Sequence, residues 1–182
     1  MDNCKCNDTN MYNRMKESWK DCQGTLKTAK TKGIRESAME DICKFILLNV
    51  FGYDTYKVET QEGMHVLDSV DFSLKDPETG KIVWIVESKT MNEYVDEGKW
   101  VDQIGKYCLK SKTNWAILTN GLKWAIYYKD INAASAGARK VYEIDDITVL
   151  SATEKDMEKL YPFTKEALKN GVREKLLSGE IK

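Results

Sequence analysis

The stretch Lys81-Ile82-Val83-Trp84-Ile85-Val86-Glu87-Ser88-Lys89 is the most apolar run of the chain, and it ends on two opposite charges. Short apolar runs rich in β-branched and aromatic residues are typical of strands that are buried in a sheet. Side chains alternate between the two faces of a strand, so Glu87 and Lys89 are expected on the same face. This segment therefore predicts a buried strand that carries a carboxylate and an amine at its end.

The segment before this strand predicts its antiparallel partner. Residues 66–75 alternate in polarity, and that alternation places Asp71 on the more polar face. The residues Asp76 to Gly80 have the composition of a tight turn between the two strands. If the register of this hairpin pairs the two polar faces, Asp71 meets Glu87 and Lys89.

The rest of the chain alternates between helical and strand periods. Some segments have apolar residues at helical spacing, and others are short apolar runs of the kind that form strands. Two of these runs flank a turn at Asn120-Gly121. Helices are expected at residues 10–27, 34–51, 92–110, 153–161 and 164–177, and strands at 56–61, 115–118, 124–128 and 140–144.

This order of elements predicts an α/β fold with a mixed central sheet of about five strands, flanked by helices. The length of 182 residues fits a single domain overall. Within it we expect a partly flexible N-terminal helical extension at residues 1–32, a core at 33–150, and C-terminal helices packed on the core at 151–182.

Charge and cysteine content limit the classes of protein that need be considered. The 28 Lys and Arg against 29 Asp and Glu give a net charge of -1, so a nucleic-acid partner would need a local basic patch. Five cysteines form no disulfide framework, the N-terminus does not resemble a signal peptide, and no apolar run approaches the length of a membrane span. A reduced cytoplasmic protein without a membrane partner is expected.

Two carboxylates and a lysine at neighbouring strand ends are the groups that a hydrolytic site requires. Mg2+ takes oxygen ligands and keeps several waters, so Asp71, Glu87 and a backbone carbonyl near Ser88 are a sufficient protein ligand set. Lys89 would then orient a water molecule or stabilise the transition state of phosphodiester cleavage. The simpler interpretation is an exposed ion pair on the strand surface, which is common in proteins.

Further motifs accompany these residues. Gln103-Ile104-Gly105-Lys106-Tyr107 follows on a predicted helix, and Trp115-Ala116-Ile117-Leu118-Thr119-Asn120-Gly121 follows as a hairpin. With Asp71 and Glu87-Ser88-Lys89, they make the chain resemble the PD-(D/E)XK nuclease superfamily. Within it, the pattern resembles the N-terminal nuclease domain of type I restriction enzyme R subunits, in a stand-alone form. The resemblance covers about residues 33 to 128, and Val70 stands where the superfamily name has a proline.

The resemblance implies a restriction-endonuclease-like fold and a role for each matching residue. Asp71 and Glu87 would be metal ligands, and Lys89 would be the catalytic lysine. Gln103 and Tyr107 would lie beside the site and the DNA. Members of the superfamily often carry a further carboxylate on the helix before the sheet, for which Glu36 is slightly favoured over Glu40.

The function implied is a Mg2+-dependent endonuclease, with Mn2+ as a substitute, that hydrolyses phosphodiester bonds of DNA in a restriction or defence setting. RNA is the alternative substrate, and a homodimer or a partner subunit is implied by the resemblance. The competing hypothesis is a catalytically silent module that keeps the nuclease fold and binds nucleic acid or protein.

Two groups of side chains have both a functional and a structural interpretation. Lys106, Lys110 and Lys123 would supply the phosphate-binding patch, although a solvated surface explains them equally well. Trp100, Trp115 and Trp124 follow helix and strand periods, which favours core packing over base stacking.

Overall fold

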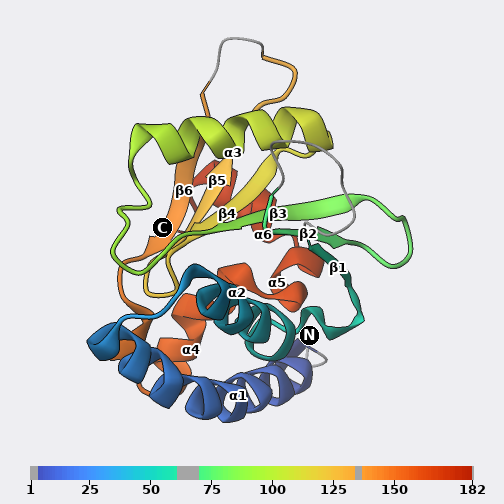
Figure 1. Cartoon of the computed structure of the whole chain (residues 1–182). Helices are drawn as coiled ribbons and strands as arrows, with labels where there is room; N and C mark the ends of the chain where they lie inside the picture. Colours follow the sequence, from blue (N-terminus) through green and yellow to red (C-terminus); the bar gives the residue numbers. More distant parts are fainter. Residues whose placement is uncertain (1–3, 61–69, 134–136, 182) are drawn as a thin grey trace.

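The computed structural model describes residues 4–60, 70–133 and 137–181. Within these residues, six strands form one sheet in the order β1-β2-β3-β4-β5-β6 (Figure 1). Strand β3 pairs with β4 in parallel, whereas the other neighbouring strands of the described sheet are antiparallel. The strands are β1 (Lys57–Thr60), β2 (Phe72–Lys75), β3 (Ile82–Ser88), β4 (Trp115–Thr119), β5 (Trp124–Tyr128) and β6 (Arg139–Ile144).

Helices cover both faces of this sheet, which confirms the predicted α/β fold. Helix α3 lies across one face, and α1, α2 and α4 lie beyond the other (Figure 1). None of the described helices is long and apolar enough to cross a membrane. The helices are α1 (Cys4–Lys32), α2 (Glu36–Phe45), η1 (Ile46–Val50), η2 (Tyr53–Thr55), α3 (Gly98–Ser111), η4 (Ile147–Val149), α4 (Glu154–Leu160), η5 (Tyr161–Phe163), α5 (Lys165–Lys169) and α6 (Val172–Ser178).

Strand β3 is buried from both sides because each face of the sheet has its own core. Trp84 and Val86 belong to the larger core, which α1, α2, α4, α5 and α6 complete. Ile85 points the other way, into a smaller core with Ile104 and Tyr107 of α3. By the same alternation Glu87 falls on the α3 face and Ser88 on the opposite face.

Two expected helices differ in extent from the structure. The helix expected at 92–110 begins only at Gly98. The side-chain amide of Asn120 donates to the carbonyls of Met91 and Glu93, at 3.3 and 3.0 Å, so these two acceptors are used outside a helix. The helix expected at 164–177 is broken into α5 and α6 by Gly171, whose φ of 72° is left-handed.

Other boundaries shift without changing the arrangement. Helix α1 is longer than the expected 10–27, and the helix expected at 34–51 changes to a π-helix at Ile46 and ends before Gly52. Of the strand expected at 66–75, residues 72–75 form β2, and residues 66–69 lie outside the described residues. Gln61, the last residue of the strand expected at 56–61, also lies outside them.

The turn between β4 and β5 packs closely on α2. Gly121 has a φ of 81°, and a Cβ atom added there would lie 2.2 Å from Sδ of Met39. Met39 is fully buried, so its side chain can move away only by displacing its neighbours in the core. The hairpin can therefore approach α2 this closely because Gly121 has no side chain.

We predict that Gly121→Ala lowers the free energy of unfolding by about 2–3 kcal/mol, because it adds a buried clash to the strain of a left-handed alanine. Gly80→Ala is the matched control, since Gly80 has a φ of 66° with nothing within 4 Å of an added Cβ. The control should lose only about 1 kcal/mol. Urea denaturation of both variants measures the difference, and equal losses would contradict the close packing of this turn.

Candidate active site at the end of strand β3

Asp71 is fixed beside the end of β3 by hydrogen bonds from Ser88. It lies directly before β2, and the register that pairs Phe72 with Val86 brings Asp71 level with Glu87. The backbone N–H and the hydroxyl of Ser88 both donate to Oδ2 of Asp71, at 2.6 and 2.7 Å. Such hydrogen bonds to a carboxylate are strong and directional, so the Asp71 side chain has a defined orientation.

Glu87 and Lys89 form a buried ion pair. Nζ of Lys89 lies 2.5 Å from Oε1 of Glu87, and their side chains are only 10% and 4% exposed. The backbone N–H of Lys89 donates to the carbonyl of Thr119 at 2.8 Å, which continues the β3–β4 pairing by one residue. The pair is therefore buried and is not an ion pair on the strand surface. Removing both charges from water has a large free-energy cost.

Burial and a neighbouring charge change the acidity of Glu87. Burial raises the pKa of Glu87, the Asp71 charge raises it further, and Lys89 acts in the opposite direction, so that the pKa lies at about 7. Oε2 of Glu87 is buried and has no hydrogen-bond partner among the residues that the structure describes. A buried acceptor without a partner, next to a second carboxylate, is suited to bind a cation or to accept a hydrogen bond from a molecule outside the chain.

The number of protein ligands limits what kind of metal site this can be. Among the residues that the structure describes, no group of three or more His, Cys, Asp or Glu side chains gathers in a way that could hold a metal ion. Asp71 and Glu87 would therefore need a backbone carbonyl and water molecules to complete a coordination shell. Mg2+ is commonly bound in this manner, whereas Zn2+ sites use more protein ligands.

Helix α3 covers the pair from the side of the smaller core. Nζ of Lys89 lies 4.1 Å from the ring centroid of Trp100, and Trp100 is half-buried. One turn later, Nε2 of Gln103 donates to the hydroxyl of Tyr107 at 2.7 Å. The structure thus brings Gln103 and Tyr107 together as expected from their spacing, and it adds Trp100, which its helical period had assigned to packing.

Helix α2 approaches Asp71 from the opposite face of the sheet. Burial raises the pKa of the Cys43 thiol, and the charges of Asp71, Cys22 and Glu40 raise it further. Glu40 is half-buried one turn before Cys43. Glu36 is the first residue of α2, and its side chain lies outside the described residues.

The three lysines of the predicted basic patch have different surroundings. Lys106 and Lys110 are exposed on α3. Lys123 instead contacts three carboxylates at 2.6, 2.8 and 3.0 Å, which belong to Asp96, Glu143 and Asp145. These acids offset the charge of Lys123, so it adds less positive potential than the sequence suggested.

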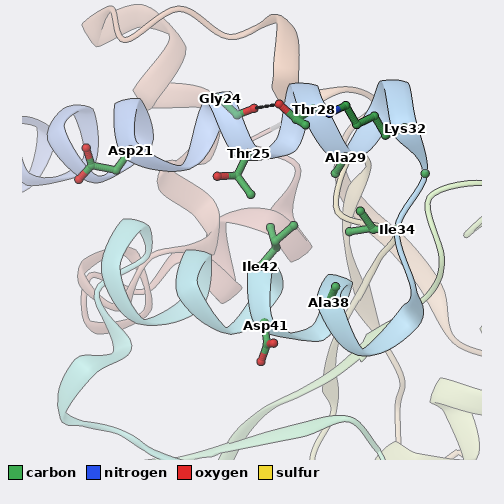
Figure 2. A pocket seen from close by; sticks show the side chains of 11 residues that line it. Asp21, Gly24, Thr25, Thr28, Ala29, Lys32, Ile34, Ala38, Asp41 and Ile42 are labelled. Carbon is green, nitrogen blue, oxygen red and sulfur yellow. Dashed lines mark hydrogen bonds between the residues drawn. The ribbon is translucent and has the colours of Figure 1, made fainter.

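A groove of about 660 Å³ lies between α1 and α2, away from this site. Figure 2 shows Thr25 and Ala29 of α1 on one side, opposite Ala38 and Ile42 of α2. Asp71, Glu87 and Lys89 are not among the residues that line it. The groove and the cluster at the end of β3 are therefore separate features.

Comparison with known proteins gave one weak structural likeness. No protein-family model and no curated protein matches the sequence. Among solved structures, the chain is similar to the type IIG restriction endonuclease BpuSI, with a TM-score of 0.41 and 22% sequence identity. The match covers 77% of this chain but 17% of that enzyme's chain, and a similarity this low assigns no function.

We predict that the metal-free protein becomes less stable, relative to Glu87→Gln, as pH rises from about 5 to about 8. A folded pKa of about 7 against the ordinary glutamate pKa of 4.5 means that the contribution of Glu87 to stability is complete below pH 4.5 and is lost as pH rises through 7. The difference should be on the order of 2 kcal/mol by denaturation at each pH. Asp71→Asn should reduce this dependence in part, because the Asp71 charge contributes to the shift. Parallel curves for wild type and Glu87→Gln would contradict the assigned environment.

Proposed function

We propose that this chain is a metal-dependent endonuclease that hydrolyses phosphodiester bonds of DNA, in a restriction or defence setting. The observation that carries the proposal is the buried pair of Glu87 and Lys89, in which Oε2 of Glu87 has no partner. A buried charge pair with an unsatisfied acceptor is unfavourable for stability alone, and such groups concentrate at functional sites.

Asp71 and Glu87 are the residues that would hold a divalent cation, together with the backbone carbonyl of Ser88. Mg2+ is the expected ion and Mn2+ a substitute, because both prefer oxygen ligands. When bound, the ion supplies Lewis acidity, which lowers the pKa of a coordinated water and neutralises charge on the phosphate. The fit rests on the donor set and on the partnerless Oε2 atom.

Lys89 has the role of orienting the attacking water and stabilising negative charge that develops on the phosphate. Its ammonium carries three N–H groups, and the contact with Glu87 uses one of them. With one side of the ammonium on Oε1 of Glu87 and another on the Trp100 ring, a remaining N–H would donate to the reacting atoms, while the ion pair keeps the ammonium at the end of β3.

Residues of the flanking helices would complete the site. Gln103 and Tyr107 lie on the same side of the sheet as Glu87, and we assign them to the border between the site and the DNA. Lys106 and Lys110 are exposed on the same helix and would contact the phosphate backbone. For the helix carboxylate, Glu36 is slightly favoured over Glu40 by its place in the sequence, and the side chain of Glu36 lies outside the described residues.

We expect the purified chain to nick supercoiled plasmid DNA with Mg2+ and to stop when EDTA is added. Lys89→Ala should reduce the rate at least ~100-fold, which is the usual cost of removing a group that stabilises the transition state. Lys155→Ala is the control, since Lys155 is exposed on α4 beyond the opposite face of the sheet. Agarose gels taken over a time course measure the three rates.

The same assay separates the remaining alternatives. A silent module with the nuclease fold would bind DNA without Mg2+-dependent cleavage, and Lys89→Ala would then leave its behaviour unchanged. Parallel reactions with duplex DNA, single-stranded DNA and RNA identify the substrate. Cleavage that persists in EDTA, or at the parent rate in Lys89→Ala, would contradict the proposed function.

A further inference from the structure

Trp100 contacts the amine that the proposed function depends on. The Lys89 ammonium lies 4.1 Å from the centroid of its ring, within the range of a cation–π interaction. The same ammonium is bound on another side by Oε1 of Glu87. Lysine has a long and flexible side chain, so a second contact from another element restricts its position much more than the ion pair alone.

The indole N–H of Trp100 has an unusual environment for this protein. Nε1 is buried and, within the described residues, has no hydrogen-bond partner. By contrast, three tryptophans of the larger core donate to protein acceptors: Trp19 to the carbonyl of Leu150, Trp84 to the hydroxyl of Tyr53, and Trp124 to the carbonyl of Gly121. Buried indole N–H groups usually have an acceptor, so the Trp100 N–H is not placed as packing alone would require.

A second atom without a partner lies one turn along the same helix. Oε1 of Gln103 is buried and has no hydrogen-bond partner among the described residues, although Nε2 of the same amide donates to Tyr107. Residues three apart on a helix lie on the same face. Within the described part of the chain, the face of α3 that contacts Lys89 therefore carries a donor and an acceptor without partners.

We propose that Trp100 is a positioning residue of the nuclease site. Its ring holds the Lys89 ammonium in place at the end of β3. The inference rests on the proposed function, and it deepens that function by assigning the contact from α3 to Lys89.

The contact with Lys89 can be tested without any cleavage assay. In protein labelled with ¹³C at the lysine Cε, the indole ring current should move the Lys89 signal upfield of the exposed lysines. Lys89→Arg identifies that signal by removing it, and Lys99→Arg identifies the other lysine near the ring, whose Nζ lies 4.4 Å from the centroid. Trp100→Leu should return the Lys89 signal to the ordinary position, and Trp100→Phe should leave part of the displacement.

Kinetics with a DNA substrate test whether this contact affects the reaction. Trp100→Leu should lower kcat about 10-fold, the size expected for losing one cation–π contact at a desolvated site. Trp100→Phe keeps an aromatic face, so it should retain kcat within about 3-fold of wild type. Tyr94→Leu is the control, because Tyr94 is an exposed aromatic residue in the loop before α3.

Each outcome decides part of the proposal. A wild-type Lys89 signal among those of the exposed lysines, or an unchanged kcat in Trp100→Leu, would overturn the positioning role. A kcat in Trp100→Phe as low as that in Trp100→Leu would also overturn it, because only Trp100→Phe keeps an aromatic face against Lys89. If no variant and no wild-type protein cleaves DNA, the proposed function fails, while the lysine spectra still decide whether the ring holds Lys89.

Discussion

The burial of β3 on both of its faces determines where every group of the candidate site lies. Trp84 and Val86 are enclosed by the larger core and Ile85 by the smaller one, so the strand has no solvent-exposed side in its second half. Its parallel pairing with β4 places Glu87 beside Leu118 and Ser88 beside Thr119, both of which are also buried. The charged residues that follow the apolar run therefore enter a region from which most water is excluded.

That location explains the electrostatics of the cluster. Glu87 lies close to a second carboxylate in a region of low polarity, so its pKa rises to about 7 even though Lys89 is bound to it. Asp71 is fixed by two donors from Ser88, and Lys89 by Glu87 and Trp100. The groups are well ordered but not all satisfied, which is typical of sites that complete their hydrogen bonds only with a ligand or substrate. The free energy that such an arrangement costs must be offset by the cores on either side of the sheet.

The sequence predicted the elements whose signals are local. The apolar run of β3, the turn at Asp76–Gly80 and the hairpin at Asn120-Gly121 carry their own signatures, and the structure has these elements. The late start of α3 could not be predicted, because it depends on the side chain of Asn120, which is distant in sequence from Met91 and Glu93. The break at Gly171 could have been predicted from the sequence, since glycine inside a helical pattern is a known stop signal.

The candidate site was predictable to a similar extent. Alternation placed Glu87 and Lys89 on one face, and the structure brings them into contact. The contact of Trp100 with Lys89 had no distinct signal, because an indole at a helical period looks the same whether it packs in a core or faces a site. The ion pairs that offset the charge of Lys123 could not be predicted from the sequence either, since its partners Asp96 and Glu143 come from separate parts of the chain.

The central claim is that the cluster at the end of β3 binds a divalent cation, and Mn2+ binding followed by electron paramagnetic resonance tests it most directly. Titration of the purified chain should show one bound Mn2+, which Mg2+ displaces in competition. Asp71→Asn and Glu87→Gln should each weaken this binding at least ~10-fold, because each replaces a carboxylate that the proposed site uses as an oxygen ligand. A wild-type protein that binds no Mn2+, or variants that bind it as tightly as wild type, would contradict the account.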